Sequence, residues 1–233
     1  MADHPMLFSA PMVRALRAGT KTQTRRTIKS ARVFATPERP AWTLRGEDLD
    51  RAMQGADRFR RMDGDGWFWE ADAFEWQAPS TRTGWLAHIG HAPGVRLWVR
   101  EAWKPHSSFS DMRPRDMPKS RIFYRADDTY APSNTPWIPS IHMPRWASRL
   151  TLIVTDVRVQ RLQEISEADA IAEGSREPSL APIIGACWSE RDAYAKLWTA
   201  INGPGSWEAN PWVTATSFDV IHQNIDEVGS GRT

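Results

Sequence analysis

A short run near the beginning of the chain gathers several side chains that could do chemistry. Residues 19–26 read Gly-Thr-Lys-Thr-Gln-Thr-Arg-Arg, which places an amine, hydroxyl groups and two guanidinium groups directly behind a glycine. A lysine can act as a base or as a cationic donor, a threonine hydroxyl can act as a nucleophile, and arginine binds phosphate or carbonyl oxygens. The run predicts the floor of a site, although a solvated, charged strand end has the same composition.

The neighbouring elements set the conditions for such a site. Residues 11–18, with a proline in the first turn, predict a short helix that ends at Gly19 in a left-handed conformation. If residues 21–27 then run extended, alternation sends Lys21 and Thr24 to opposite faces of the strand. The two side chains could therefore meet only across a turn or a bulge.

A second candidate residue lies far along the chain. Residues 151–162 are β-branched and partly alternating, which predicts a core strand, and residues 165–174 predict a helix that begins at Ser166 and ends at Gly174. Glu173 falls in the last turn of that helix, where the helix dipole disfavours a carboxylate. We expect Glu173 to have a compensating cation or a functional role.

Tryptophan and arginine lie side by side in two further segments. The chain holds 13 tryptophans, and residues 96–103 and 143–149 interleave them with arginines. This pattern suits stacking on bases with phosphates held nearby. These segments supply four candidate binding residues, namely Glu101, Trp103, Arg145 and Trp146. The alternative for each is a salt bridge with a packed indole.

Length and composition indicate a single domain over residues 1–233. The chain is 41% hydrophobic and 25% charged, with a formal net charge of +2, as is ordinary for soluble globular proteins. It has no apolar run of membrane-spanning length and no signal peptide pattern, so we expect a cytoplasmic protein without membrane contact. Its single cysteine, Cys187, excludes an internal disulfide.

The other elements follow from composition and spacing. Residues 29–91 are rich in Pro, Gly, Asp and Arg and predict an insertion, with a strand at 67–70 and a hairpin partner at 74–76. Residues 190–201 predict an amphipathic helix and residues 212–221 a closing strand. Residues 226–233 predict a frayed tail. The histidines lack the spacing of a metal site, so we expect neither a metal nor another cofactor.

Two motifs carry a resemblance to a known family. They are Gly-x-Lys-x-x-Thr-x-Arg at 19–26 and Leu-x-x-Ile-Ser-x-x-x-Ala-x-x-Glu-Gly at 162–174. With these motifs the chain resembles the ASCH domain family of the PUA-like superfamily, in particular its phage and prophage members. The resemblance implies an α+β fold, namely a curved mixed β-barrel flanked by short helices, with an insertion after the first strand.

The resemblance also implies a function. Small bacterial ASCH proteins similar to this pattern hydrolyse N4-acetylcytidine, and their catalytic residues correspond to Lys21, Thr24 and Glu173. Arg26 is expected at the mouth of the same cleft. PUA-like folds generally bind RNA or modified nucleobases, so the expected partner is a modified nucleoside or RNA, in a bacterium or a phage-infected host cell. Other ASCH members are ribonucleases.

The chemistry of these groups leaves two mechanisms open. Neutral Lys21 could activate Thr24 while Glu173 protonates the departing amine, or protonated Lys21 could polarise the carbonyl while Glu173 activates water. Two functions without catalysis are also open, namely a reader of RNA or modified bases and a phage assembly protein with a vestigial pocket. Nothing in the sequence indicates an oligomeric state.

Overall fold

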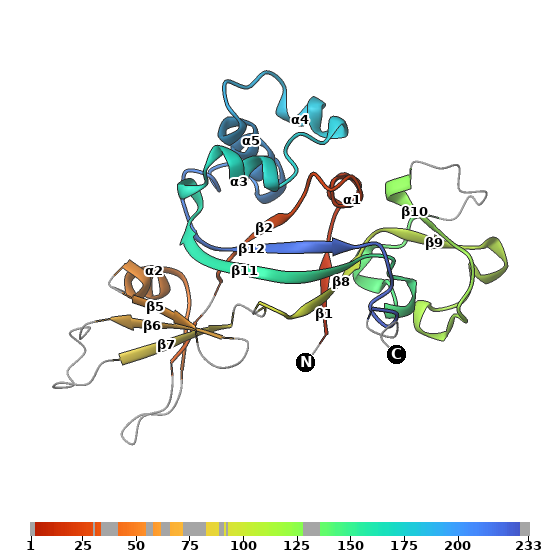
Figure 1. Ribbon diagram of the computed structural model, residues 1–233, viewed down its shortest axis with the longest axis horizontal. Coiled ribbons are helices and arrows are strands. Elements are labelled where there is room, and N and C mark those ends of the chain that lie inside the picture. The colour runs from red at the N-terminus through yellow and green to blue at the C-terminus, as the bar shows by residue number, and fades with distance from the viewer. Residues whose placement is uncertain are drawn as a thin grey trace.

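A mixed five-stranded sheet forms the centre of the protein (Figure 1). The computed structural model describes residues 3–29, 31–33, 42–54, 58–61, 66–71, 83–88, 91, 93–127 and 136–228. The sheet order is β1-β8-β11-β12-β2, with β1 parallel to β8 and the other neighbours antiparallel. The strands are β1 (His4–Leu7), β2 (Gln23–Thr27), β8 (Arg96–Arg100), β11 (Thr151–Arg161) and β12 (Trp212–Ile221). The α+β class is confirmed, and the described strands form an open sheet that does not close into a barrel.

The longest paired strands of this sheet are β11 and β12. Their ladder runs from Thr151 opposite Ile221 to Arg161 opposite Trp212, with a bulge between Val154 and Asp156. The β-branched and leucine side chains of β11 enter the main apolar core, which suits a half-buried pleated surface. The predicted strands at 151–162 and 212–221 are confirmed.

Four helices lie on one side of β11 and β12, namely α1 (Ala10–Arg17), α3 (Glu167–Ala172), α4 (Ala181–Ile184) and α5 (Glu190–Asn202) (Figure 1). The hydroxyl of Ser166 accepts a hydrogen bond from the Asp169 amide and so caps α3. Gly19 and Gly174 follow α1 and α3 with φ of 71° and 81°. The predicted helices and both glycine stops are confirmed, with shifts of one or two residues at the ends.

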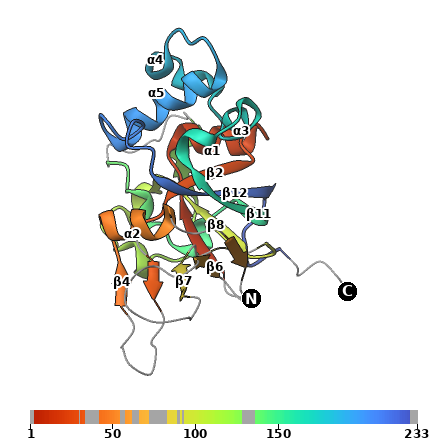
Figure 2. The same cartoon turned by 90° about the vertical axis from the view of Figure 1, so that its left-hand side faces the viewer.

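A second sheet lies on the other side of β11 and β12 (Figure 2). Its order is β4-β3-β7-β6-β5, and every pair is antiparallel. Its elements are β3 (Ala31–Val33), β4 (Trp42–Leu44), the helix α2 (Gly46–Gln54), β5 (Arg58–Arg61), β6 (Gly66–Ala71) and β7 (Thr83–His88). The strand predicted at 67–70 lies within β6, which pairs with β5 and β7, and the predicted partner at 74–76 lies outside the described residues.

The remaining segments form a small two-stranded sheet and short 3-10 turns. The Trp- and Arg-rich segment 96–103 does not form one continuous strand. The strand β8 ends at Arg100, and β9 (Trp103–Pro105) pairs with β10 (Ile122–Tyr124). The 3-10 turns span Ser107–Phe109, Pro114–Asp116, Arg125–Asp127, Ser140–His142, Arg145–Ala147, Leu162–Glu164 and Pro178–Leu180. Among the helices that the structure describes, none combines the length and the apolar composition needed to cross a membrane.

Candidate active site

The fold brings Lys21 and Glu173 together from positions 152 residues apart. The two residues form an isolated antiparallel bridge through their backbones. The Lys21 Nζ lies 2.9 Å from the Glu173 Oε2, and the two side chains are only 2% and 5% exposed. The pair therefore joins the turn after α1 to the end of α3 inside the protein.

Two glycines make this approach possible. The turn at Gly19 directs the amides of Thr20 and Lys21 to the carbonyl of Ala15, at 3.0 and 3.1 Å. A Cβ on Gly174 would lie 3.0 Å from the Ala15 Cβ and 3.1 Å from the Lys21 Cβ, at a positive φ that disfavours other residues. Gly174 is thus required both for its backbone conformation and for contact between α3 and Lys21.

The amine of Lys21 has three acceptors around it. It donates to the Gln23 carbonyl at 2.7 Å, to the Glu173 carbonyl at 2.7 Å and to the Glu173 carboxylate at 2.9 Å. An ammonium group has three N–H donors, whereas a neutral amine has two and a lone pair. The surroundings therefore fit protonated Lys21.

The surroundings of Lys21 shift its pKa in opposite directions. Burial lowers its pKa, the Glu173 carboxylate raises it, and the nearby Arg26 and Arg25 lower it again. The balance is a pKa below the ordinary lysine value. Lys21 is thus held as a cation by its acceptors but gives up its proton more easily than an exposed lysine.

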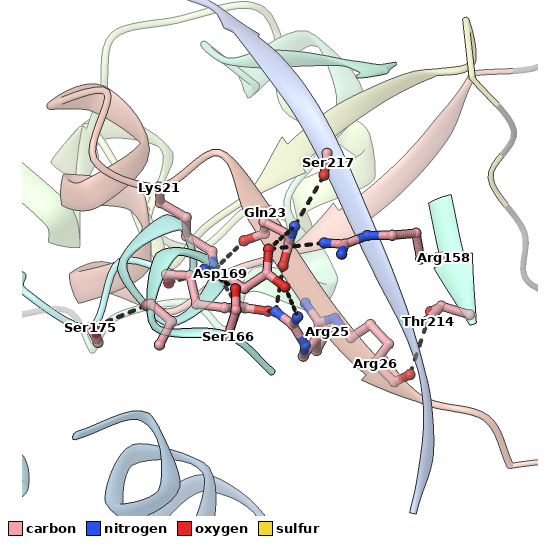
Figure 3. Close-up of polar contacts among 12 residues, drawn as sticks. Lys21, Gln23, Arg25, Arg26, Arg158, Ser166, Asp169, Ser175, Thr214 and Ser217 are labelled. Atoms are coloured by element: carbon pink, nitrogen blue, oxygen red, sulfur yellow. Dashed lines mark hydrogen bonds and ion pairs between the residues drawn. The ribbon is translucent and has the colours of Figure 1, made fainter. Parts of the chain in front are cut away.

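Further charged and polar groups gather next to Lys21, among them Gln23, Arg25, Asp169 and Arg158 (Figure 3). Arg25 donates to the Glu173 Oε1 at 3.2 Å and to the Asp169 Oδ2 at 2.9 Å, and it also donates to the Gln23 side chain. Arg158 of β11 reaches the Asp169 Oδ1 at 2.9 Å. Burial raises the pKa of Asp169, but Arg158 and Arg25 outweigh that effect and leave it lowered. The compensating cations expected for Glu173 are therefore Lys21 and Arg25.

Sequence reasoning did not assign a role to three members of this network, namely Gln23, Arg25 and Asp169. A signal for them exists, because Lys21, Gln23 and Arg25 are spaced by two residues and so share one face of an extended segment. Asp169 and Glu173 are spaced by four residues and so share one face of a helix. Matching the two faces pairs the cations with the carboxylates.

Thr24 lies apart from this network. It is buried in β2, where it pairs with Thr216 of β12, and strand alternation places it on the face opposite Gln23 and Arg25. In the described part of the chain, no hydrogen bond joins its hydroxyl to Lys21 or Glu173. The structure thus brings together two of the three predicted catalytic residues and places the third on the other face of the strand.

Arg26 is exposed, and strand alternation places it on the same face of β2 as Thr24. Its guanidinium donates to the Leu7 carbonyl at 2.7 Å and lies 5.7 Å from the centre of the Phe8 ring. The Lys21 Nζ lies 5.9 Å from the same ring. Phe8 therefore contacts both cations, and Arg26 keeps further N–H donors for a ligand.

Glu101 and Trp103 lie in a different part of the protein. Arg149 binds the buried Glu101 carboxylate through two hydrogen bonds of 2.8 and 3.0 Å. Burial raises the pKa of Glu101 although Arg149 lowers it. Trp103 is completely buried beside Met143 in an apolar cluster. These contacts correspond to the packing alternative, with the salt bridge in the interior and not on the surface.

Arg145 and Trp146 also lie away from Lys21. Arg145 binds Asp3 at 2.5 Å and Asp226 at 2.7 Å, which fixes the start of the predicted tail, and residues 229–233 lie outside the described residues. Trp146 is partly buried and lines an open hollow of about 510 Å³. This hollow involves β10 and the segment after β12, and Lys21 and Glu173 are not among its lining residues.

The described residues contain no group of three or more histidine, cysteine, aspartate or glutamate side chains that could hold a metal ion. The chain was also compared with known proteins. A scan against protein-family models, a search of curated proteins and a search of solved structures each find no match. The geometry of the site and the two sequence motifs therefore carry the functional argument.

Proposed function

We propose that the protein is an ASCH-like member of the PUA-like superfamily that hydrolyses the amide of an N4-acylcytidine-type nucleoside at Lys21 and Glu173. The observation that carries the proposal is the buried ion pair of 2.9 Å between these residues, which connects the two motifs behind the resemblance. Arg26 and Lys21 both approach the Phe8 ring, at 5.7 and 5.9 Å from its centre, and Arg26 keeps donors for a pyrimidine oxygen or a phosphate.

The proposed reaction uses Glu173 as the base and Lys21 as a cationic donor. Glu173 takes a proton from water, and the water oxygen forms a bond to the acyl carbon. As Glu173 becomes protonated, its carboxyl group accepts the hydrogen bond from Lys21 more weakly. One Lys21 N–H can then turn toward the oxyanion that develops. The carbon–nitrogen bond then breaks, and the proton on Glu173 passes to the departing nitrogen, which yields a carboxylic acid and cytidine.

The alternative mechanism, in which neutral Lys21 activates Thr24, has less support. It requires Lys21 to lose a proton and Thr24 to reach it from the opposite face of β2. The lowered pKa of Lys21 favours the first condition. The three acceptors around the amine disfavour it.

A second candidate function is a non-catalytic reader of RNA or a modified base. The observation that favours it is the saturation of Lys21, whose three donors are all used and whose side chain is 2% exposed. A pair of this kind can brace α3 against β2 while the exposed Arg26 contacts the ligand. A reader binds oligonucleotides in a salt-sensitive way without turnover.

The test is incubation of the purified protein with acylated nucleosides, including N4-acetylcytidine, and with short RNAs, followed by mass spectrometry. We expect release of the acyl group from the nucleoside and loss of that activity in Glu173→Gln. Glu208→Gln, which removes an exposed carboxylate, serves as the matched control. Binding without any product would reject the hydrolase and support the reader.

A further inference from the structure

The open hollow beside Trp146 has the size of a small-ligand site. It is formed by residues 119–122 at the start of β10, by the turn that carries Trp146, and by residues 224–227 after β12. Its volume of about 510 Å³ lies in the range of small-molecule pockets. Three segments that are far apart in the sequence build this hollow.

Its polar groups favour an anion. Lys119 and Arg121 are exposed at the hollow, and neither has an acidic partner in the described part of the chain. The Ser120 hydroxyl between them is buried and has no hydrogen-bond partner there. Two acidic residues also line the hollow, namely Asp226 and Glu227. Arg145 neutralises Asp226 through an ion pair of 2.7 Å.

The aromatic side of the hollow is held in place. The Asn224 side-chain amide donates to the carbonyls of Arg145, Trp146 and Ser148, at 3.0, 3.3 and 2.7 Å. The Trp146 ring packs partly against the apolar cluster around Trp103, while its indole N–H has no partner among the described residues. These hydrogen bonds hold the backbone around Trp146, so this segment requires little ordering when a ligand binds.

We propose that this hollow binds a nucleotide, with the base stacked on Trp146 and the phosphate held by Lys119 and Arg121. A planar base suits an indole, and a phosphate suits two cations without an acidic partner, of which Arg121 also lies 5.5 Å from the centre of the Phe123 ring. The nucleotide can be free or part of single-stranded RNA. This inference is independent of hydrolysis at Lys21 and Glu173.

The test is calorimetric titration of the full chain with cytidine monophosphate, with cytidine and with a short single-stranded RNA. We expect the monophosphate or the RNA to bind and cytidine to bind more weakly. The double variant Lys119→Ala/Arg121→Ala should weaken binding by about tenfold. The control Arg113→Ala/Arg115→Ala removes the same charge from the same loop but outside the hollow, and it should change binding by less than about twofold.

This experiment distinguishes a free nucleotide from single-stranded RNA as the ligand. Binding of the monophosphate indicates a site for free nucleotides, and binding of the RNA alone indicates a site for one residue of a strand. A wild-type protein that binds neither ligand would overturn the proposal. Equal weakening in the two double variants would also overturn it, because the contribution would then be general charge and not the hollow.

Discussion

At the scale of single residues, the central feature is a lysine whose surroundings supply one acceptor for each ammonium hydrogen. Two of these acceptors belong to Glu173, and the third is the Gln23 carbonyl. A buried charge of this kind is tolerated because it is both paired and hydrogen-bonded. The partner carboxylate depends in turn on Lys21 and Arg25.

Removing the lysine charge should therefore destabilise the protein. We expect Lys21→Met, which keeps the length and the apolar stem, to lower the free energy of unfolding by about 3–5 kcal/mol, because Glu173 loses a buried partner. Urea denaturation measures this change. Lys29→Met at an exposed position should stay within about 0.5 kcal/mol, and an equal loss in both variants would contradict the argument.

At the scale of elements, the site depends on how α3 ends against the turn after α1. Gly174 lets α3 approach until its backbone lies against the side chains of Ala15 and Lys21. The amide of Thr22 also donates to the carbonyl of Ala172 at 2.9 Å. The end of one helix thus fixes the position of the other motif.

We expect Gly174→Ala to lower the free energy of unfolding by about 2–4 kcal/mol, since it adds a strained positive φ and a crowded Cβ. Gly19→Ala is the matched control, because Gly19 also has a positive φ but no atom within 4 Å of an added Cβ. It should cost about 1–2 kcal/mol. Thermal unfolding of both variants checks the difference, and equal costs would exclude the close contact as a cause.

Elements with a strong local signal were predictable from the sequence. The ends of α1 and α3 follow from glycines, and the strands at 151–161 and 212–221 follow from β-branched composition. The break between β8 and β9 was not predictable, because the second part pairs with β10 and not with the central sheet. Local composition does not reveal which partner a strand takes.

The candidate site was predictable only in part for the same reason. Alternation correctly separated Lys21 from Thr24, and the unfavourable position of Glu173 correctly indicated cations nearby. The contacts of Glu101 and Trp103 were not predictable, since a charged group beside an indole fits both a pocket and a packed interior. Only the position of Arg149 and the apolar cluster around Trp103 distinguishes the two cases.

At the scale of the whole molecule, the main apolar core includes residues from the segment that also forms the second sheet. In the sequence, the helix α2 lies between the strands β4 and β5 of the second sheet. Its Leu49 and Met53 side chains are buried in the main apolar core. The N-terminal and C-terminal segments are also connected, because Asp3 and Asp226 both bind Arg145. The segment 29–91 is therefore attached to the main apolar core by the packing of α2 as well as through the chain.

This attachment predicts a stability effect across the molecule. We expect Met53→Ala to lower the free energy of unfolding by about 2–5 kcal/mol, as for other large side chains removed from a core. Asp48→Ala, at an exposed position on the same helix, should cost about 1 kcal/mol or less. Chemical denaturation followed by circular dichroism measures both, and a negligible effect of Met53→Ala would show that α2 does not support the core.

The most direct test of the central claim is the pH dependence of acetate release from N4-acetylcytidine. Because burial lowers the pKa of Lys21, the cationic form is lost as the pH rises through a value below the ordinary 10.5. If Lys21 acts as a cation and Glu173 as the base, the rate should fall across that range, Lys21→Arg should retain activity without this fall, and Thr24→Ala should weaken turnover without abolishing it. A rate that instead rises as Lys21 loses its proton, with Lys21→Arg and Thr24→Ala both folded and inactive, would contradict the account.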